Sequence, residues 1–274
     1  MDNLLKQINL FKSGENGYHT YRIPALTVTK AGTVLVFCEG RKSSRSDSGD
    51  IDILLKRSTD NGETWAETQV VAENGKDTAG NPAPVVDGKT GNIILLFTQN
   101  LADGGETEIC KGNAPRTVWK TVSKDDGKTW SESEEITDQV KKSAWTWYAT
   151  GPCHGIQLES GRLVIPCDHI VGKDFNRETD PYHSHIIYSD DGGRNWNIGG
   201  IVDKNTNESV VVETVDNNLY INCRQIIGNK RAYAWSRDQG ESFSELQYSD
   251  TLIEPQCQAS MIRYTTEADY QKNR

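Results

Sequence analysis

The sequence predicts an all-β protein assembled from repeated modules of short strands, as in a β-propeller. The first observation is an eight-residue pattern, S-x-D-x-G-x-[T/N/S]-[W/F], that starts at Ser58, Ser123, Ser189 and, more loosely, Ser236. The second is that short apolar runs bounded by turn residues precede each copy, with no helical stretches between them. Repeats of this length with several strands each are typical of propeller blades.

The repeated pattern has the chemistry of a turn. An aspartate can accept hydrogen bonds from backbone N–H groups ahead of it, glycine adopts positive φ without steric cost, and the closing aromatic ring anchors the turn. The spacing differs from that of an EF-hand calcium loop, since position 1 counted back from Gly62 would be Arg57. We interpret the four copies as structural turns.

The strand-like stretches can be placed in order along the chain. Residues 1–17 are expected to form an irregular lead-in. The expected strands are then 18–27, 32–38 and 51–57 before the first turn, 91–97 and 117–122 before the second, 161–167 and 185–188 before the third, and 218–224 and 231–235 before the fourth.

A fifth module is expected to begin at Gln258, after which a polar tail, 265–274, ends the sequence. A propeller closes its ring so that no blade edge is left open. Residues 1–274 are therefore expected to supply the N-terminal four to five blades of a domain that is incomplete at the C-terminus.

Composition excludes several classes of function. The chain of 274 residues has a net charge of −9 and no basic run, which argues against binding to nucleic acid. The sequence contains no run of 18 apolar residues, so no transmembrane helix is expected. The first residues lack the apolar core of a signal peptide, so the protein is either cytoplasmic, or secreted or periplasmic with its leader removed. The six widely spaced cysteines are expected to be reduced.

Two arginines occupy positions where a strand should be buried. Arg22 lies between Tyr21 and Ile23, and Arg224 ends a run in which alternate residues are apolar. A buried guanidinium needs a partner, because an unpaired buried charge is strongly destabilising. The partner is either a carboxylate of the protein or an anionic ligand held by the guanidinium fork.

Further candidate residues lie near these two arginines in the sequence. Arg41, at the end of an apolar run, is either a third pocket arginine or a solvated strand-end charge. Asp47 lies on a polar loop, which suits a general acid, and Asp50 or Asp52 could substitute for it. Glu208 opens the strand that leads to Arg224, but by composition alone it is an exposed loop acid.

The histidines give a weak metal signal. His183 and His185 alternate along one strand, but no third ligand is placed by spacing, and His169 is distant in sequence. We expect no metal and no cofactor. The sequence also lacks a glycine-rich phosphate loop and a G-x-S-x-G nucleophile elbow.

These stretches together resemble the non-viral sialidases (neuraminidases), whose Asp-box repeats share the S-x-D-x-G-x-T-W pattern. The resemblance runs from about Tyr18 to Tyr264. It is carried by Tyr21-Arg22-Ile23-Pro24, Gly40-Arg41 with Asp47 beyond it, Asn81-Pro82-Ala83-Pro84, Trp147-Tyr148-Ala149-Thr150-Gly151-Pro152, Asn207-Glu208-Ser209, Asn222-Cys223-Arg224 and Glu254-Pro255-Gln256-Cys257-Gln258.

The resemblance implies a six-bladed β-propeller that removes terminal sialic acids from glycans, glycoproteins or gangliosides with retention. Arg22 and Arg224 match two of three arginines that bind the substrate carboxylate, and Arg41 matches a further pocket arginine. Asp47 matches the acid/base, and Glu208 matches the glutamate that activates a tyrosine nucleophile. A neutral tyrosine suits an anomeric carbon whose carboxylate would repel an anionic nucleophile.

Three further positions are expected to bind substrate by the same resemblance, namely Asn81, Tyr148 and Tyr182. The third arginine and the nucleophilic tyrosine have no match, and Tyr270 lies in the wrong context. This chain alone is therefore expected to have little activity.

Two alternatives remain open at this point. One is a non-catalytic Asp-box propeller that binds sialylated glycans or a protein partner. The other is an Asp-box glycosidase for a neutral sugar, which would not need the arginines. Linkage preference, transfer in place of hydrolysis, and oligomeric state are not given by the sequence.

Overall fold

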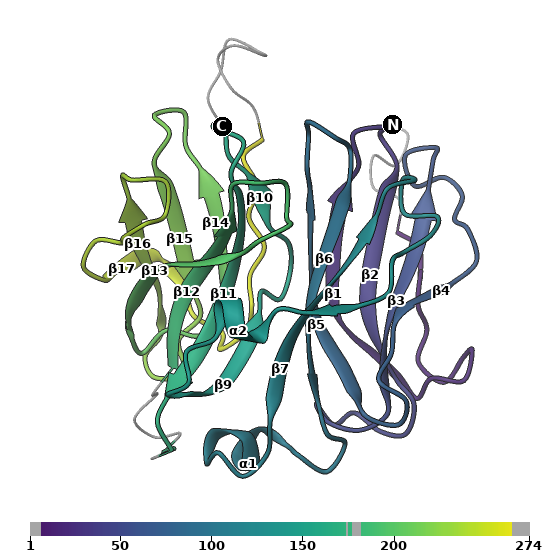
Figure 1. The fold of residues 1–274 in the computed structure, drawn as a ribbon, viewed down its shortest axis with the longest axis horizontal. Helices are drawn as coiled ribbons and strands as arrows, with labels where there is room; N and C mark the ends of the chain where they lie inside the picture. The colour runs from purple at the N-terminus through teal and green to yellow at the C-terminus, as the bar shows by residue number, and fades with distance from the viewer. Residues whose placement is uncertain (1–6, 174, 177–181, 265–274) are drawn as a thin grey trace.

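The computed structural model describes residues 7–173, 175–176 and 182–264, and its strands form antiparallel groups arranged side by side (Figure 1). The first group comprises β1 (Thr20–Val28), β2 (Val34–Arg41), β3 (Ile51–Ser58) and β4 (Gln69–Ala72). The second comprises β5 (Thr78–Val86), β6 (Ile93–Asn100), β7 (Arg116–Ser123) and β8 (Glu134–Glu135). A parallel pairing of Ile51 with Thr78 joins these two groups into an eight-stranded sheet.

Two more groups form separate sheets. One comprises β9 (Trp145–Thr150), β10 (Ile156–Gln157), β11 (Leu163–Val171), β12 (Tyr182–Ser189) and β13 (Asn197–Lys204). The other comprises β14 (Ser209–Glu213), β15 (Leu219–Cys223), β16 (Lys230–Ser236) and β17 (Gln247–Ile253). The all-β prediction is confirmed, and the four groups of the described residues do not form a closed ring.

Two short helices interrupt the strands, α1 (Glu106–Cys110) and α2 (Thr137–Val140). Each is about one turn long, so neither could show a helical period in the sequence. None of the helices in the described ranges is long and apolar enough to cross a membrane. All six cysteines are free.

The repeated turns join the last two strands of each group. In the first turn, Gly62 N–H donates to Ser58 Oγ at 2.8 Å, while the N–H and hydroxyl of Thr64 donate to Asp60 at 2.9 and 2.6 Å. Equivalent bonds recur in the turns that start at Ser123, Ser189 and Ser236. Each aspartate is used within its own turn, which agrees with a structural role.

The groups pack through apolar faces that follow the alternation of each strand. On β15, the predicted apolar face of Leu219, Ile221 and Cys223 is fully buried in the core between the third and fourth groups. The first strands of the first three groups meet, because β1 contacts β5 and β5 contacts β9, while β14 of the fourth group contacts β11. Side chains at the ends of these first strands are thereby brought to a common region.

The strand expected at 258–264 is not formed. Residues 254–264 contain no strand, and side chains hold this segment instead. Gln258 Nε2 donates to the carbonyls of Pro152 and Ser209, and Arg263 donates to the carbonyl of Glu213. This stretch therefore adds no strand to the described sheets, and the tail with Tyr270 lies outside the described residues.

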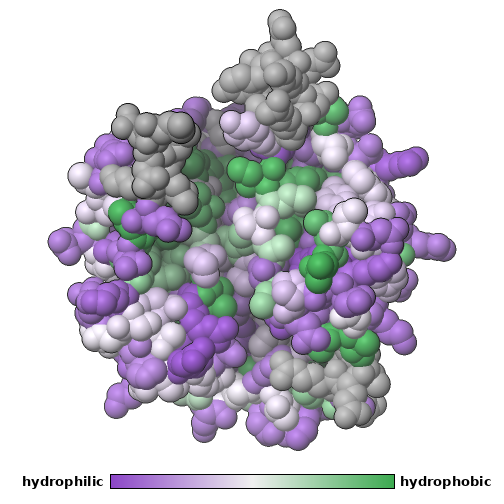
Figure 2. Space-filling model, turned by 180° about the vertical axis from the view of Figure 1, so that it is seen from behind, coloured by the Kyte–Doolittle hydropathy of each residue, from purple (hydrophilic) through white to green (hydrophobic). Residues whose placement is uncertain are grey.

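The outermost strands carry exposed apolar side chains. Leu26 and Val28 of β1 and Leu252 and Ile253 of β17 are all exposed. On the face seen in Figure 2, apolar patches alternate with polar residues. The edge strands β1 and β17 thus have apolar side chains facing solvent.

Candidate active site

One cavity collects seven of the eight residues expected to form the site: Arg22, Arg41, Asp47, Asn81, Tyr182, Glu208 and Arg224. They come from all four strand groups, so the cavity lies where the groups converge. Its other lining residues are Ile23, Glu39, Ser48, Thr78, Glu106, Arg116, Trp147, Ala149, Asp168, Asn207 and Ile226. The lining is dominated by charged and amide side chains.

The same backbone irregularity brings Arg22 and Asn81 to the cavity. In β1 the register with β2 shifts between Arg22 and Ala25, and Ile23 has a φ of 57° before Pro24. In β5 the register with β6 shifts between Gly80 and Ala83, and Asn81 has the same φ of 57° before Pro82. Such bulges re-aim a side chain without ending the strand.

Arg22 differs from expectation in its exposure. Its side chain is 44% exposed, because the bulge turns it out of the strand face and into the open cavity, where Nη1 donates to Asp47 Oδ1 at 3.0 Å. The expectation that the Arg22 side chain is buried is therefore wrong. The need for an anionic partner is met by an aspartate of the protein.

Arg41 is a buried pocket arginine rather than a solvated strand-end charge. Its side chain is 2% exposed, and Nε and Nη2 both donate to Glu39 Oε2 at 2.9 and 2.6 Å. The other oxygen, Glu39 Oε1, accepts from Asn81 N–H at 2.9 Å. A Cβ on Gly80 would lie 2.6 Å from Glu39 Oε1, so only glycine fits beside this carboxylate.

Asp47 lies at the mouth of the cavity between two cations. It is 74% exposed, and its Oδ1 is 3.0 Å from Arg22 Nη1 and 2.7 Å from Arg41 Nη1. The two other aspartates considered for its role do not line the cavity, because Asp50 and Asp52 both pair with Lys42. Among these three acids only Asp47 can reach a ligand there.

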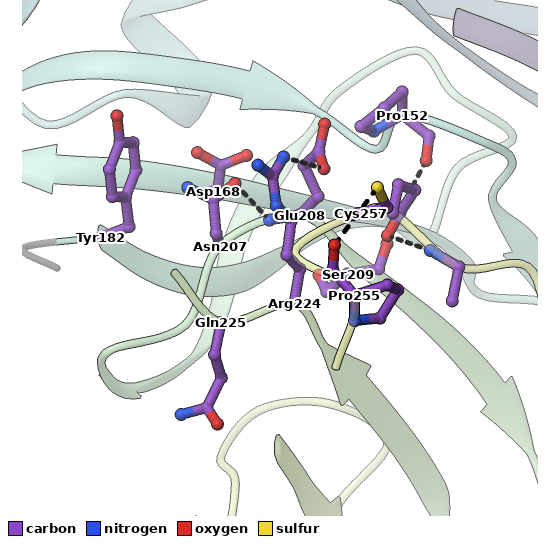
Figure 3. A network of polar contacts seen from close by, with 12 residues as sticks. Pro152, Asp168, Tyr182, Asn207, Glu208, Ser209, Arg224, Gln225, Pro255 and Cys257 are labelled. Carbon is purple, nitrogen blue, oxygen red and sulfur yellow. Dashed lines mark hydrogen bonds and ion pairs between the residues drawn. The ribbon is translucent and has the colours of Figure 1, made fainter. Parts of the chain in front are cut away.

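Glu208 and Arg224 form a pair on the opposite side of the cavity (Figure 3). Arg224 Nη1 donates to Glu208 Oε2 at 2.5 Å, and the backbone N–H of Arg224 donates to the carbonyl of Glu208 at 2.8 Å. The side chains are 16% and 24% exposed for Glu208 and Arg224. The expectation from composition of an exposed loop acid at Glu208 is therefore wrong, since the backbone pairing draws it inward.

Asn81 belongs to a polar network behind the cavity. Its Oδ1 accepts from Arg116 Nη2 at 2.6 Å. Arg116 also donates to Asn100 Oδ1 and to the carbonyl of Tyr148, and it lies 4.3 Å from the centre of the Trp147 ring. The buried guanidinium is held by neutral acceptors, and burial lowers the pKa of Arg116.

Tyr182 lines the cavity next to an acidic residue of α1. Its hydroxyl donates to Glu106 Oε1, and its side chain is fully buried. Burial and, after it, the Glu106 carboxylate raise the pKa of Tyr182. Tyr182 therefore stays protonated at neutral pH.

Tyr148 is the one expected site residue that the structure places elsewhere. It is fully buried in the core, its hydroxyl lies 3.4 Å from Cys167 Sγ, and it does not line the cavity. On β9 the residues to either side, Trp147 and Ala149, point to the cavity instead, since neighbouring side chains of a strand face opposite ways. Its expected role in substrate binding is thus corrected.

Sequence reasoning missed Glu39, Glu106, Arg116 and Asp168. Asp168 carried a readable signal, because a carboxylate within the apolar run of β11 is as unusual as Arg22 in β1. Glu106 lies in a polar stretch and Arg116 at the start of a strand, so neither stands out without the fold.

The histidines converge more closely than their sequence spacing indicated. β11 and β12 pair so that His169 is opposite His183, and the Nδ1 atoms of His169 and His185 are 3.0 Å apart. Sequence distance was therefore a poor reason to set His169 aside. Across the described ranges, no group of three or more His, Cys, Asp or Glu side chains could hold a metal ion.

The chain matches known proteins over most of its length. Residues 32–264 match the model of a BNR repeat-like domain. The chain is 34% identical to an exo-alpha-sialidase of Aspergillus fumigatus over 92% of this chain and 63% of that protein. It is 32% identical to a sialidase of Bacteroides fragilis over 91% of this chain and 48% of that protein.

A solved structure has the same arrangement of strands. The Hadza microbial sialidase Hz136 superposes with a TM-score of 0.83 at 32% identity, over 92% of this chain and 52% of that one. The chain thus spans about half to two thirds of the length of these relatives. The similarity to sialidases expected from the sequence is confirmed.

Proposed function

Because the chain belongs to the family of BNR repeat-like domains, we propose that the protein is an exo-α-sialidase, a glycoside hydrolase that releases terminal sialic acids. The observation that carries the proposal is that Arg22, Arg41 and Arg224 line one cavity together with Asp47 and Glu208. Guanidinium groups bind carboxylates through paired hydrogen bonds, and a sialic acid has a carboxylate on its anomeric carbon. A neutral sugar would offer these arginines no counter-charge.

The proposed architecture is a six-bladed propeller. Each antiparallel group would be one blade, and residues 1–274 would supply four to five of them, with 1–17 as lead-in. Support comes from the four groups, from the Asp-box turn before the last strand of each, and from the contacts of β1 with β5 and of β5 with β9.

The proposed reaction begins with an exchange of ion pairs. The substrate carboxylate replaces Asp47 on Arg22 and shares Arg224 with Glu208, which releases Asp47 from Arg22 at the mouth of the cavity. Protonated Asp47 then gives its proton to the leaving glycosidic oxygen as the C–O bond breaks. Its exposure suits this role, because the leaving group must extend out to solvent.

Retention requires two displacements at the anomeric carbon. We assign Glu208 to accept the proton of a tyrosine, whose oxygen attacks that carbon and forms a glycosyl-enzyme. Water then attacks the same carbon, Asp47 takes its proton, and the tyrosine leaves with the proton from Glu208. The tyrosine has no matched position among residues 1–274, so this step belongs to the whole protein.

Sialylated glycans, including those of glycoproteins or gangliosides, are the proposed substrates. The test is release of the fluorophore from an aryl α-sialoside by the full-length gene product, with Arg22→Ala as the inactive comparison and Tyr148→Phe as the neutral one. Proton NMR of the first-formed sugar would show the α-anomer if configuration is retained.

Three results would contradict the proposal in different ways. No release by the full-length protein would exclude a sialidase. Arg22-dependent binding of sialic acid without release would favour a non-catalytic glycan-binding propeller. Release of a neutral sugar that survives Arg22→Ala would indicate a different glycosidase.

A further inference from the structure

Asp168 is a buried carboxyl group with one oxygen unused. It lies on β11, is 1% exposed, and lines the same cavity as Glu208 and Arg224. Its Oδ1 accepts a hydrogen bond from Trp147 Nε1 at 2.8 Å. Its Oδ2 is buried and has no hydrogen-bond partner within the described part of the chain. Figure 3 shows the group between Tyr182 and the Glu208–Arg224 pair.

An unused buried oxygen of this kind calls for a partner. Buried polar atoms are nearly always hydrogen-bonded, and leaving one unpaired is destabilising. Asp168 lies beside a fully paired neighbour, since Tyr182 donates to Glu106. Because Asp168 lines the cavity, a ligand bound there is the partner nearest to hand for the missing bond.

The protonation state decides what kind of partner fits. Burial raises the pKa of Asp168 well above its ordinary value, Glu208 adds to the rise, and Arg116 and Arg224 only partly oppose it. Because Oδ1 already accepts from Trp147, the proton belongs on Oδ2. Oδ2 is then a hydrogen-bond donor directed at a neutral oxygen acceptor.

We propose that Asp168 is a specificity-determining residue that donates a hydrogen bond from Oδ2 to a neutral oxygen of the bound sugar acid, either a hydroxyl or an amide carbonyl. The arginines hold the carboxylate end of the sugar, and Asp168 recognises an uncharged group on the same molecule. This inference deepens the proposed function and rests on it.

The test compares two near-isosteric substitutions by calorimetric titration of N-acetylneuraminic acid into the full-length gene product. Asp168→Asn keeps a neutral donor, so affinity should stay within about threefold of the unsubstituted protein. Asp168→Leu removes the donor, and affinity should fall by about tenfold or more. Tyr148→Phe removes a buried hydroxyl outside the cavity and should change nothing. Equal loss in Asp168→Asn and Asp168→Leu, or no loss in either, would overturn the proposal.

Dependence on pH gives a second readout that holds even if Asp168→Leu fails to fold. As pH rises through its raised pKa, Asp168 loses its proton and becomes an acceptor beside Glu208, so affinity should fall. Asp168→Asn should lack this alkaline loss. The same alkaline profile in both proteins would overturn the donor role.

Three sialic acid analogues identify the oxygen that is contacted. One analogue lacks the C4 hydroxyl, the second lacks the acetamido group, and the third lacks the outer carbons of the side chain. The penalty of Asp168→Leu should vanish for one of them. Equal penalties for all three would overturn a specific contact, whereas failure of the unsubstituted protein to bind any sialic acid would overturn the proposed function itself.

Discussion

Arginine and carboxylate side chains are paired with one another across the cavity lining. Arg22 and Arg41 meet Asp47, Arg41 also meets Glu39, and Arg224 meets Glu208. These arginines can therefore form internal ion pairs and also bind a ligand, because the two interpretations are not exclusive. The internal partners hold the guanidinium groups in position, and the cavity between them leaves room for a competing carboxylate.

Replacing the proposed acid should affect substrates unequally. With Asp47→Asn, hydrolysis of natural sialosides should slow by about 10²–10⁴-fold, because their leaving oxygen needs a proton. Activated aryl sialosides, which leave as stable anions, should slow far less. The measurement is kcat/KM on both substrate types, and equal losses on both would argue against an acid role.

A charge-conserving substitution tests the geometry of carboxylate binding. Arg224→Lys should weaken sialic acid binding by about tenfold or more, since a point charge cannot replace the planar fork. Arg162→Lys is the matched control, because Arg162 pairs with Asp190 and Glu241 away from the cavity. Titration calorimetry measures both, and a similar loss in the control would point to general destabilisation.

The sequence predicted those site residues that break a local pattern. Arg22 and Arg224 stood out as charges in strand-like runs, and Asp168 could have been found by the same rule. Glu39 and Arg116 could not, because their importance arises from partners far away in sequence, such as Asn81. Tyr148 was misplaced because a one-residue step along a strand reverses the side-chain direction.

At the scale of the element, the Asp-box turns connect backbone conformation to packing. In the fourth turn Gly240 has a φ of 89°, and a Cβ there would lie 2.2 Å from Ile186 Cδ1. Gly161 has a similar φ of 94° but no atom within 4 Å of its Cβ position. Comparing the two positions separates the cost of left-handed backbone from the cost of steric overlap.

Alanine at each position should therefore destabilise by different amounts. Gly161→Ala should cost about 1–2 kcal/mol, from left-handed backbone alone. Gly240→Ala should cost a further ~1–3 kcal/mol, since Ile186 must move within a packed core. Free energies of unfolding from denaturant titration measure the difference, and equal costs would show that the core near Ile186 yields freely.

The strands that could be predicted were those next to a repeated turn. Their apolar runs and turn residues are local signals, so 51–57 and 117–122 fall within the observed β3 and β7. β5 and β9 were missed because prolines, small residues and polar residues mask their alternation. Residues 258–264 read as a strand but had no neighbouring strand to pair with.

At the scale of the whole molecule, stability should decline steadily as pH falls. Hydrogen bonds within the turns lower the pKa of Asp60 and of Asp125 to about 2. Burial, then His183, lowers the pKa of His185 from 6.5 to about 3, and burial also lowers that of His169. For each of these four side chains, the unfolded chain takes up a proton at a higher pH than the folded chain does, so acid favours unfolding.

The histidines should act first, between pH 6.5 and about 3, and the turn aspartates between about 4 and 2. Urea midpoints measured from pH 8 downward should therefore fall from about pH 6.5, and His185→Gln should make that decline shallower. His19→Gln, at an exposed position, should leave it unchanged. A midpoint that is flat from pH 7 to 4 would contradict the assignment.

The internal pairing of the cavity also bears on selectivity among small anions. Arg22, Arg41, Arg116 and Arg224 face Glu39, Asp47, Glu106 and Glu208, while burial keeps Asp168 neutral. The lining of the pocket is therefore close to electroneutral, and chloride, phosphate or other abundant anions gain little by entering it. A sugar acid is admitted by the directional fit of its own oxygens, so the protein can carry several inward-facing guanidinium groups without being inhibited by the salts around it.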